Sequence, residues 1–208
     1  MKVETLFLFS LASLSINLIP GPDVVYIVSN TMKGKVQSGT QAAVGLGIGY
    51  LFHTFAAVLG LSTLLLNSVY LFNIIKYFGA AYLLYLGLMS IKNCSSGKSK
   101  TFLDDINVPQ GNIFKQGIFI SILNPKVALF FLSFLPQFVD SSSGNTSYQL
   151  LVLGSFFTVL ATCCNIVYAI IGSKLFNSRK VSKYNGKIEG LSGVLLVGLA
   201  TKIVFDKN

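Results

Sequence analysis

The chain has 208 residues, of which 52% are hydrophobic and only 11% are charged. Soluble domains average about 25% charged residues, so this composition and a mean hydropathy of +0.68 exclude an ordinary soluble enzyme. The net charge of +9 does not indicate nucleic-acid binding, because most basic residues lie in short gaps between apolar runs and do not form one basic face. The three cysteines and the single histidine lack metal-ligand spacing, so we expect no metal and no cofactor.

Six apolar windows are long enough to cross a bilayer as helices, which takes about 20 residues each. The first exceeds the apolar region of a signal peptide and lacks an A-x-A-like cleavage site, so we expect it to be retained. Short polar segments separate the windows, which predicts a single membrane domain over residues 1–208. In chain order the windows cover residues 6–32, 39–66, 69–91, 113–139, 148–172 and 189–205.

Basic residues are distributed unequally between the two sides of this topology. Alternate loops carry ten lysines and arginines on one side and three on the other, and the richer side is expected to be cytoplasmic. Both termini are therefore predicted outside, with a cytoplasmic loop at about 93–112. Three spans on each side of that loop give the halves opposite orientations. The sequence thus predicts an all-α polytopic membrane protein of two inverted three-helix repeats, at about 4–92 and 113–206.

The first and fourth windows contain matching proline motifs. A span broken by proline is tolerated in lipid only where protein or water covers the freed backbone groups, so each motif marks a cavity or an interface. Carbonyls about one turn before the first motif, near Ile16 and Leu18, lose their helical donors. The motif residues, which we expect to bind substrate, are Asn17, Pro20, Gly21, Pro22 and Asp23 in the first window and Asn124, Pro125 and Lys126 in the fourth.

Asp23 and Lys126 are the only acid and base placed well inside spans, apart from Lys76 near a span edge. A charge at the bilayer centre costs about 2.5–3.5 kcal/mol on insertion scales, which a partner or a polar cavity must offset. We therefore expect the two to serve each other. The functional hypothesis is that a zwitterionic substrate replaces this ion pair. Its ammonium group would bind Asp23 and the freed carbonyls, and its carboxylate would bind Lys126. The alternative is an ion pair that only fixes helix register.

Other polar or small residues inside the windows have two readings each. His53 is either a proton relay or a hydrogen-bonded core residue. Gly45 and Gly49 form a G-x-x-x-G face that is expected to let another helix approach closely rather than to contact a ligand. The remaining candidates either line a cavity or join helices by hydrogen bonds, and they are Tyr82, Tyr85, Thr158, Thr162 and Asn165.

Over essentially its whole length the chain resembles the LysE/RhtB family of bacterial amino-acid exporters. The resemblance is carried by NLIPGPD at 17–23, the glycine-rich opening of the second window, GAAYLLYLG at 79–87 and LNPKVALFFLSFLPQFV at 123–139. It implies a six-span, multi-pass protein of the bacterial inner membrane that exports amino acids or close derivatives, driven by the proton gradient. It also implies that the proline motifs of both halves belong to the translocation site.

The leading hypothesis is a secondary transporter that exports amino acids by proton antiport, with an amino acid, protons and the lipid bilayer as its partners. One alternative is an exporter of metal or other small ions, which would want more intramembrane ligands than one Asp and one His. Another is a membrane assembly protein without transport activity. An enzyme is not expected, because no nucleophile and base are placed together. Whether the chain forms a homo-oligomer is left open.

Overall fold

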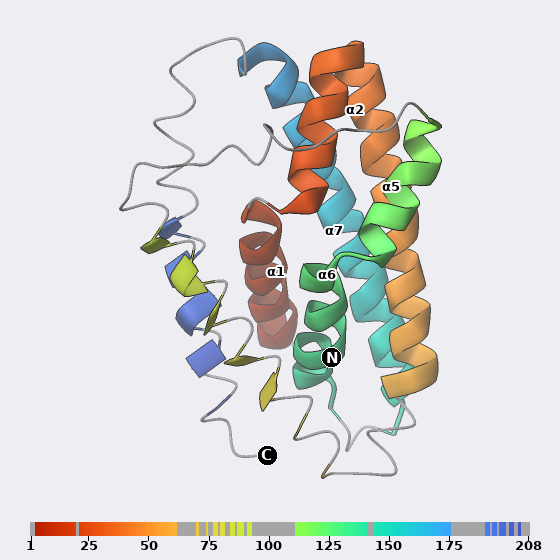
Figure 1. The fold of residues 1–208 in the computed structure, drawn as a ribbon. Coiled ribbons are helices and arrows are strands. Elements are labelled where there is room, and N and C mark those ends of the chain that lie inside the picture. The colour runs from red at the N-terminus through yellow and green to blue at the C-terminus, as the bar shows by residue number, and fades with distance from the viewer. Residues whose placement is uncertain are drawn as a thin grey trace.

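The computed structural model describes residues 3–19, 21–61, 111–140 and 144–175, together with single residues and short helical stretches between 70 and 92 and between 190 and 204. All regular structure in this part of the chain is helical, as predicted (Figure 1). By length and composition, two helical stretches of the described chain could cross a membrane: Pro22–Gly60, which is divided by a turn at Gly34 and Lys35, and Thr146–Gly172. A bent pair, Ile113–Ile122 with Pro125–Phe138, makes a third if it is taken as one span. Most of the third and sixth predicted windows lies outside the described residues.

The first predicted span is broken where its prolines lie. Helix α1 runs over Val3–Leu18, with Glu4 in its first turn, where the helix dipole favours a negative charge. Helix α2 runs over Pro22–Ala56 and continues into a π-helical turn, η1, at Ala57–Leu61. Its first residue is a proline, which fits the start of a helix because the missing N–H has no helical partner there. The break therefore falls at the predicted motif.

Helix α2 is itself divided by a tight turn. Gly34 and Lys35 have non-helical backbone angles, and Lys35 has a positive φ of 61°. The chain reverses direction here, as Figure 1 shows, and Gly39 on the returning segment packs against Thr31 on the first. Residues 22–33 and 36–56 are thus two helices joined by two residues. The turn lies in the basic segment that was predicted to separate the first two spans.

The second half of the chain also contains a helical segment that is interrupted at a proline. Helix α5 runs over Ile113–Ile122, and its axis is bent by 46° from the helical segment that begins at Pro125. That segment consists of α6 at Pro125–Leu129, a π-helical turn η3 at Phe130–Phe134 and a 3-10 turn η4 at Leu135–Phe138. Helix α7 then covers Thr146–Leu175, which at 1.5 Å per residue is about 45 Å long.

Close helix contacts hold α5 against the returning segment of α2. A Cβ atom added at Gly117 would lie 2.9 Å from the carbonyl oxygen of Ala42, and one added at Gly45 would collide with the backbone of Phe114. Backbones can approach this closely only where side chains are absent. The predicted packing role of Gly45 is therefore confirmed, and α5 is its partner.

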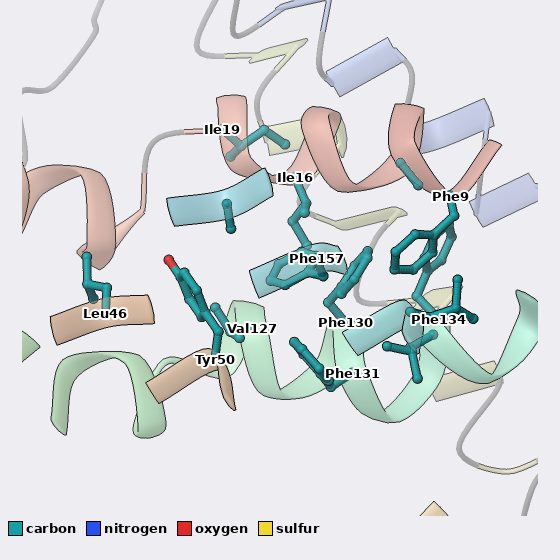
Figure 2. Close-up of a cluster of buried hydrophobic side chains, with 14 of the residues drawn as sticks. Phe9, Ile16, Ile19, Leu46, Tyr50, Val127, Phe130, Phe131, Phe134 and Phe157 are labelled. Atoms are coloured by element: carbon teal, nitrogen blue, oxygen red, sulfur yellow. The ribbon is translucent and has the colours of Figure 1, made fainter. Parts of the chain in front are cut away.

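Aromatic rings fill the space between α1, α7 and the segment that follows Pro125 (Figure 2). The ring of Phe130 stacks on Phe157 with centroids 4.7 Å apart, and Phe157 meets Tyr50 edge to face at 5.6 Å. Phe9 of α1 contacts Phe130 at 6.0 Å. Such pairs add to the free energy of apolar burial. The cluster therefore holds α1 and α2, from the first half of the chain, against α7 and the segment after Pro125, from the second half.

Candidate functional site

The first break exposes backbone carbonyls to other helices. Because Pro22 has no N–H, the carbonyl of Leu18 cannot receive its usual helical hydrogen bond. The hydroxyl of Tyr168, on α7, lies 3.4 Å from the carbonyl oxygen of Leu18 and 3.5 Å from that of Asn17. The cap of the following helix is Gly21, in an extended conformation and without a side chain to bond the backbone. The carbonyls at this break thus depend on donors from elsewhere in the fold.

The second break satisfies more of its own backbone. Asn124 caps α6, since its Oδ1 accepts a hydrogen bond of 3.0 Å from the N–H of Lys126. Pro125 deprives the carbonyl of Ser121 of its helical donor, and two substitutes replace it: the N–H of Asn124 at 3.1 Å and Nε2 of His53 at 3.1 Å. His53 also stacks on Phe131, with ring centroids 5.6 Å apart. His53 is therefore hydrogen-bonded, as expected if it is a core residue.

Asp23 and Lys126 join the two breaks in one ion pair. The Nζ of Lys126 lies 3.0 Å from both carboxylate oxygens of Asp23 and donates to the carbonyl of Ile19 at 3.2 Å. Their side chains are only 1% and 6% exposed, respectively. Removal of two charges from solvent is expensive unless they are paired and hydrogen-bonded, as they are here. The structure thus brings the two predicted charges into direct contact.

Gly21 makes this contact sterically feasible. A Cβ atom at this position would lie 2.8 Å from Oδ1 of Asp23 and 3.0 Å from Nζ of Lys126. Real Cβ atoms show almost no contacts shorter than 3.0 Å, so a side chain here would force the charged groups or the backbone to shift. The glycine of the motif is therefore part of the site through the space that it leaves.

A buried hydrogen bond joins α7 to α2. Nδ2 of Asn165, on α7, donates to the hydroxyl of Tyr50, on α2, at 3.0 Å. Two buried amide atoms, Oδ1 of Asn165 and Nδ2 of Asn124, have no hydrogen-bond partner among the described residues. Buried polar groups are usually paired, so such atoms are candidates to bind a ligand or water.

The other predicted site residues are placed as follows. Asn17 is buried, and its Nδ2 donates to the carbonyl of Ser13 at 2.7 Å. Thr158 is buried and bonds to its own helix through the carbonyl of Gly154 at 2.9 Å, whereas Thr162 lies against Gly47. Tyr85 is 58% exposed. Pro20 and Tyr82 lie outside the described residues.

Sequence reasoning missed Tyr50 and Tyr168, which the structure adds to the site. Both stand in apolar runs, where a tyrosine resembles any other core aromatic. The sequence contains one signal for Tyr168. It follows Asn165 by three residues and so extends the series of polar residues Thr158, Thr162 and Asn165 by about one helical turn.

The fold and the site together define a helical membrane protein whose two broken segments meet at a buried ion pair. A family model described as "LysE type translocator" matches residues 14–207, and the chain belongs to this family. It is 36% identical over 198 residues to "Uncharacterized membrane protein YrhP" of Bacillus subtilis (strain 168), covering 89% of this chain and 91% of that protein. It is 31% identical over 196 residues to "Leucine efflux protein" of Salmonella typhimurium, covering 94% and 92%. No solved structure gives a significant match.

Proposed function

We propose that this protein exports amino acids from the cytoplasm and that the Asp23–Lys126 pair is the substrate site. The observation that carries the proposal is the pair itself, buried, in direct contact and located where two spans are broken. Family membership and the leucine efflux relatives support the transport of amino acids. A buried ion pair at a helix break is costly in the membrane, and intramembrane charges commonly serve function.

A zwitterion can replace the internal pair without leaving a buried charge unpaired. Its ammonium group meets the carboxylate of Asp23 and the carbonyls at the end of α1. Its carboxylate meets Nζ of Lys126 and Nδ2 of Asn124, the buried donor without a partner among the described residues. Because each substrate charge takes over a protein charge, the electrostatic balance of the site is kept during the exchange.

The surroundings of the pair favour a neutral, apolar substrate side chain. The buried neighbours of the two breaks include Ile16, Val127 and the rings of Phe130 and Phe157. Once Asp23 has taken the α-ammonium group, no second buried carboxylate is available in the described part of the chain for a cationic side chain. Leucine, named in the relatives, fits these conditions and is the first substrate to test.

Export then proceeds by alternating access between two inverted repeats, with both termini outside and the protein in the bacterial inner membrane. Asp23 and Lys126 are 103 residues apart, each directly follows the proline of its break, and those prolines have the same separation. Such matching positions are typical of repeat-built transporters. Protonation of Asp23 would weaken its hold on an ammonium group, which offers a route for proton antiport. A protonophore that abolishes leucine export would support this coupling, and undiminished export would contradict it.

Purified protein in liposomes loaded with labelled leucine tests the function. The wild type should release leucine at a rate well above that of protein-free liposomes. Asp23→Asn should reduce release to the protein-free rate, because a neutral amide cannot bind an ammonium group as tightly. Glu4→Gln makes the same chemical change at an exposed position of α1 and should leave release unchanged. Full transport by Asp23→Asn would refute the site.

A further inference from the structure

Three consecutive carbonyls at the end of α1 accept hydrogen bonds from side chains of the second half of the chain. The carbonyl of Ile19 accepts from Nζ of Lys126 at 3.2 Å. Those of Leu18 and Asn17 share the hydroxyl of Tyr168 at 3.4 and 3.5 Å. This segment is therefore a row of acceptors whose donors are one ammonium group and one phenol.

The row and the carboxylate of Asp23 together form an acceptor set suited to a primary ammonium group. Such a group carries three N–H donors and has no acceptor. An incoming ammonium that displaces Lys126 gains the three oxygens that Nζ contacts, namely both carboxylate oxygens of Asp23 and the carbonyl oxygen of Ile19. The carbonyls of Leu18 and Asn17, next to Ile19 in the chain, are further acceptors for its N–H donors, and in this structure they accept from Tyr168.

The hydrogen bonds of Tyr168 are suited to exchange. Distances of 3.4 and 3.5 Å are long for an O–H donor, whose usual range is about 2.5–3.0 Å, and one proton is shared between two carbonyls. By contrast, Lys126 lies 3.0 Å from each oxygen of Asp23. Of the two donors at the break, the phenol is thus the more weakly held.

We propose that the Tyr168 hydroxyl competes with the α-ammonium group of the substrate for the carbonyls of Leu18 and Asn17. Tyr168 thereby sets the affinity for the amine end of the substrate and speeds its release. The inference rests on the proposed function, since it needs an amino acid bound at the Asp23–Lys126 pair.

Removal of this competitor should tighten binding and slow export together. Tyr168→Phe should lower the Kd for leucine by about two- to tenfold, the effect of one neutral hydrogen bond, and lower the maximal efflux rate. Binding is measured by calorimetry on purified protein, and efflux from leucine-loaded liposomes. A merely structural role would reduce the amount of active protein and leave Kd unchanged. Tyr148→Phe removes a hydroxyl from an exposed residue of the same helix and should change neither quantity.

The 2-hydroxy acid analogue of leucine makes the test specific, because it lacks the ammonium group. Tyr168→Phe should not tighten binding of this analogue. If Tyr168→Phe is unstable, Tyr168→Met also lacks the donor and should tighten leucine binding in the same direction. An unchanged or higher Kd for leucine in a folded variant would overturn the inference while leaving the proposed function intact. A wild-type protein that neither binds nor releases any amino acid would overturn both.

Discussion

The two breaks share a backbone device but differ in the groups that they offer. Each begins its second helical segment with a proline, and each proline is followed directly by a charged residue. The first break presents acceptors, namely the carboxylate of Asp23 and a row of carbonyls. The second presents donors, namely Nζ of Lys126 and Nδ2 of Asn124. The difference shows that two similar helix interruptions can supply the negative and the positive member of one ion pair.

The caps account for much of this difference. Gly21 has no side chain to cap the N–H groups of α2, and because Pro22 has no N–H, the carbonyl of Leu18 is left to the distant donor Tyr168. Asn124 bonds the backbone of its own helix, and the carbonyl of Ser121 is bonded by Asn124 and His53. Nζ of Lys126 takes no part in these backbone bonds and donates to the first break.

Removal of one charge should have the largest effect on this arrangement. Lys126→Met leaves the carboxylate of Asp23 buried without its cation, which should lower the free energy of unfolding by about 3–5 kcal/mol. Combining it with Asp23→Leu removes both charges, so stability should return while leucine transport stays absent. Thermal unfolding in detergent and liposome efflux measure the two effects. If the double variant were as unstable as Lys126→Met, the pair would not be the cause.

A methyl group at the first cap should have the next largest effect. Gly21→Ala places a Cβ within 3.0 Å of both charged groups, so the pair must separate or the backbone must shift. We expect a loss of roughly 1–3 kcal/mol in unfolding free energy, as for other overpacked sites, and weaker leucine binding. Gly60→Ala is the matched control, because a Cβ there meets nothing within 4 Å. Equal effects of the two substitutions would argue against a special role for Gly21.

Changes at the second cap should be smallest and should separate stability from binding. Asn124→Ala removes both the helix cap and the free donor, at about 1 kcal/mol of stability, whereas Asn124→Ser keeps a capping oxygen. Leucine binding should weaken in both variants, but only the alanine variant should lose stability. Asn112→Ala removes the corresponding cap of α5 at an exposed position and should leave binding unchanged. Normal binding by Asn124→Ser would remove Nδ2 from the proposed site.

The sequence was informative where a residue breaks a strong physical rule. Prolines within apolar runs and isolated charges in a membrane are costly, so the breaks and the pairing of Asp23 with Lys126 could be predicted. The turn at Gly34 and Lys35 also falls in the predicted polar gap. The close packing of Gly45 followed from its lack of a side chain.

Residues that break no local rule could not be identified. Tyr168 is compatible with any buried helix, and the carbonyl of Leu18, to which it donates, lies 150 residues away in the chain. The π-helical turn at Phe130–Phe134 has no signature in a run of aromatic residues either. Residues that bond to a helix break from a distant part of the chain can therefore be identified only from the structure, even when the break itself is evident from the sequence.

The two-residue turn inside α2 has a mechanical consequence. Residues 22–33 carry Asp23, residues 36–56 carry His53, and only Gly34 and Lys35 separate them. The two segments pack against each other, since Gly39 lies against Thr31, and His53 on the second segment is hydrogen-bonded to the carbonyl of Ser121 at the opposite break. A helical hairpin therefore connects the two breaks, in addition to the ion pair.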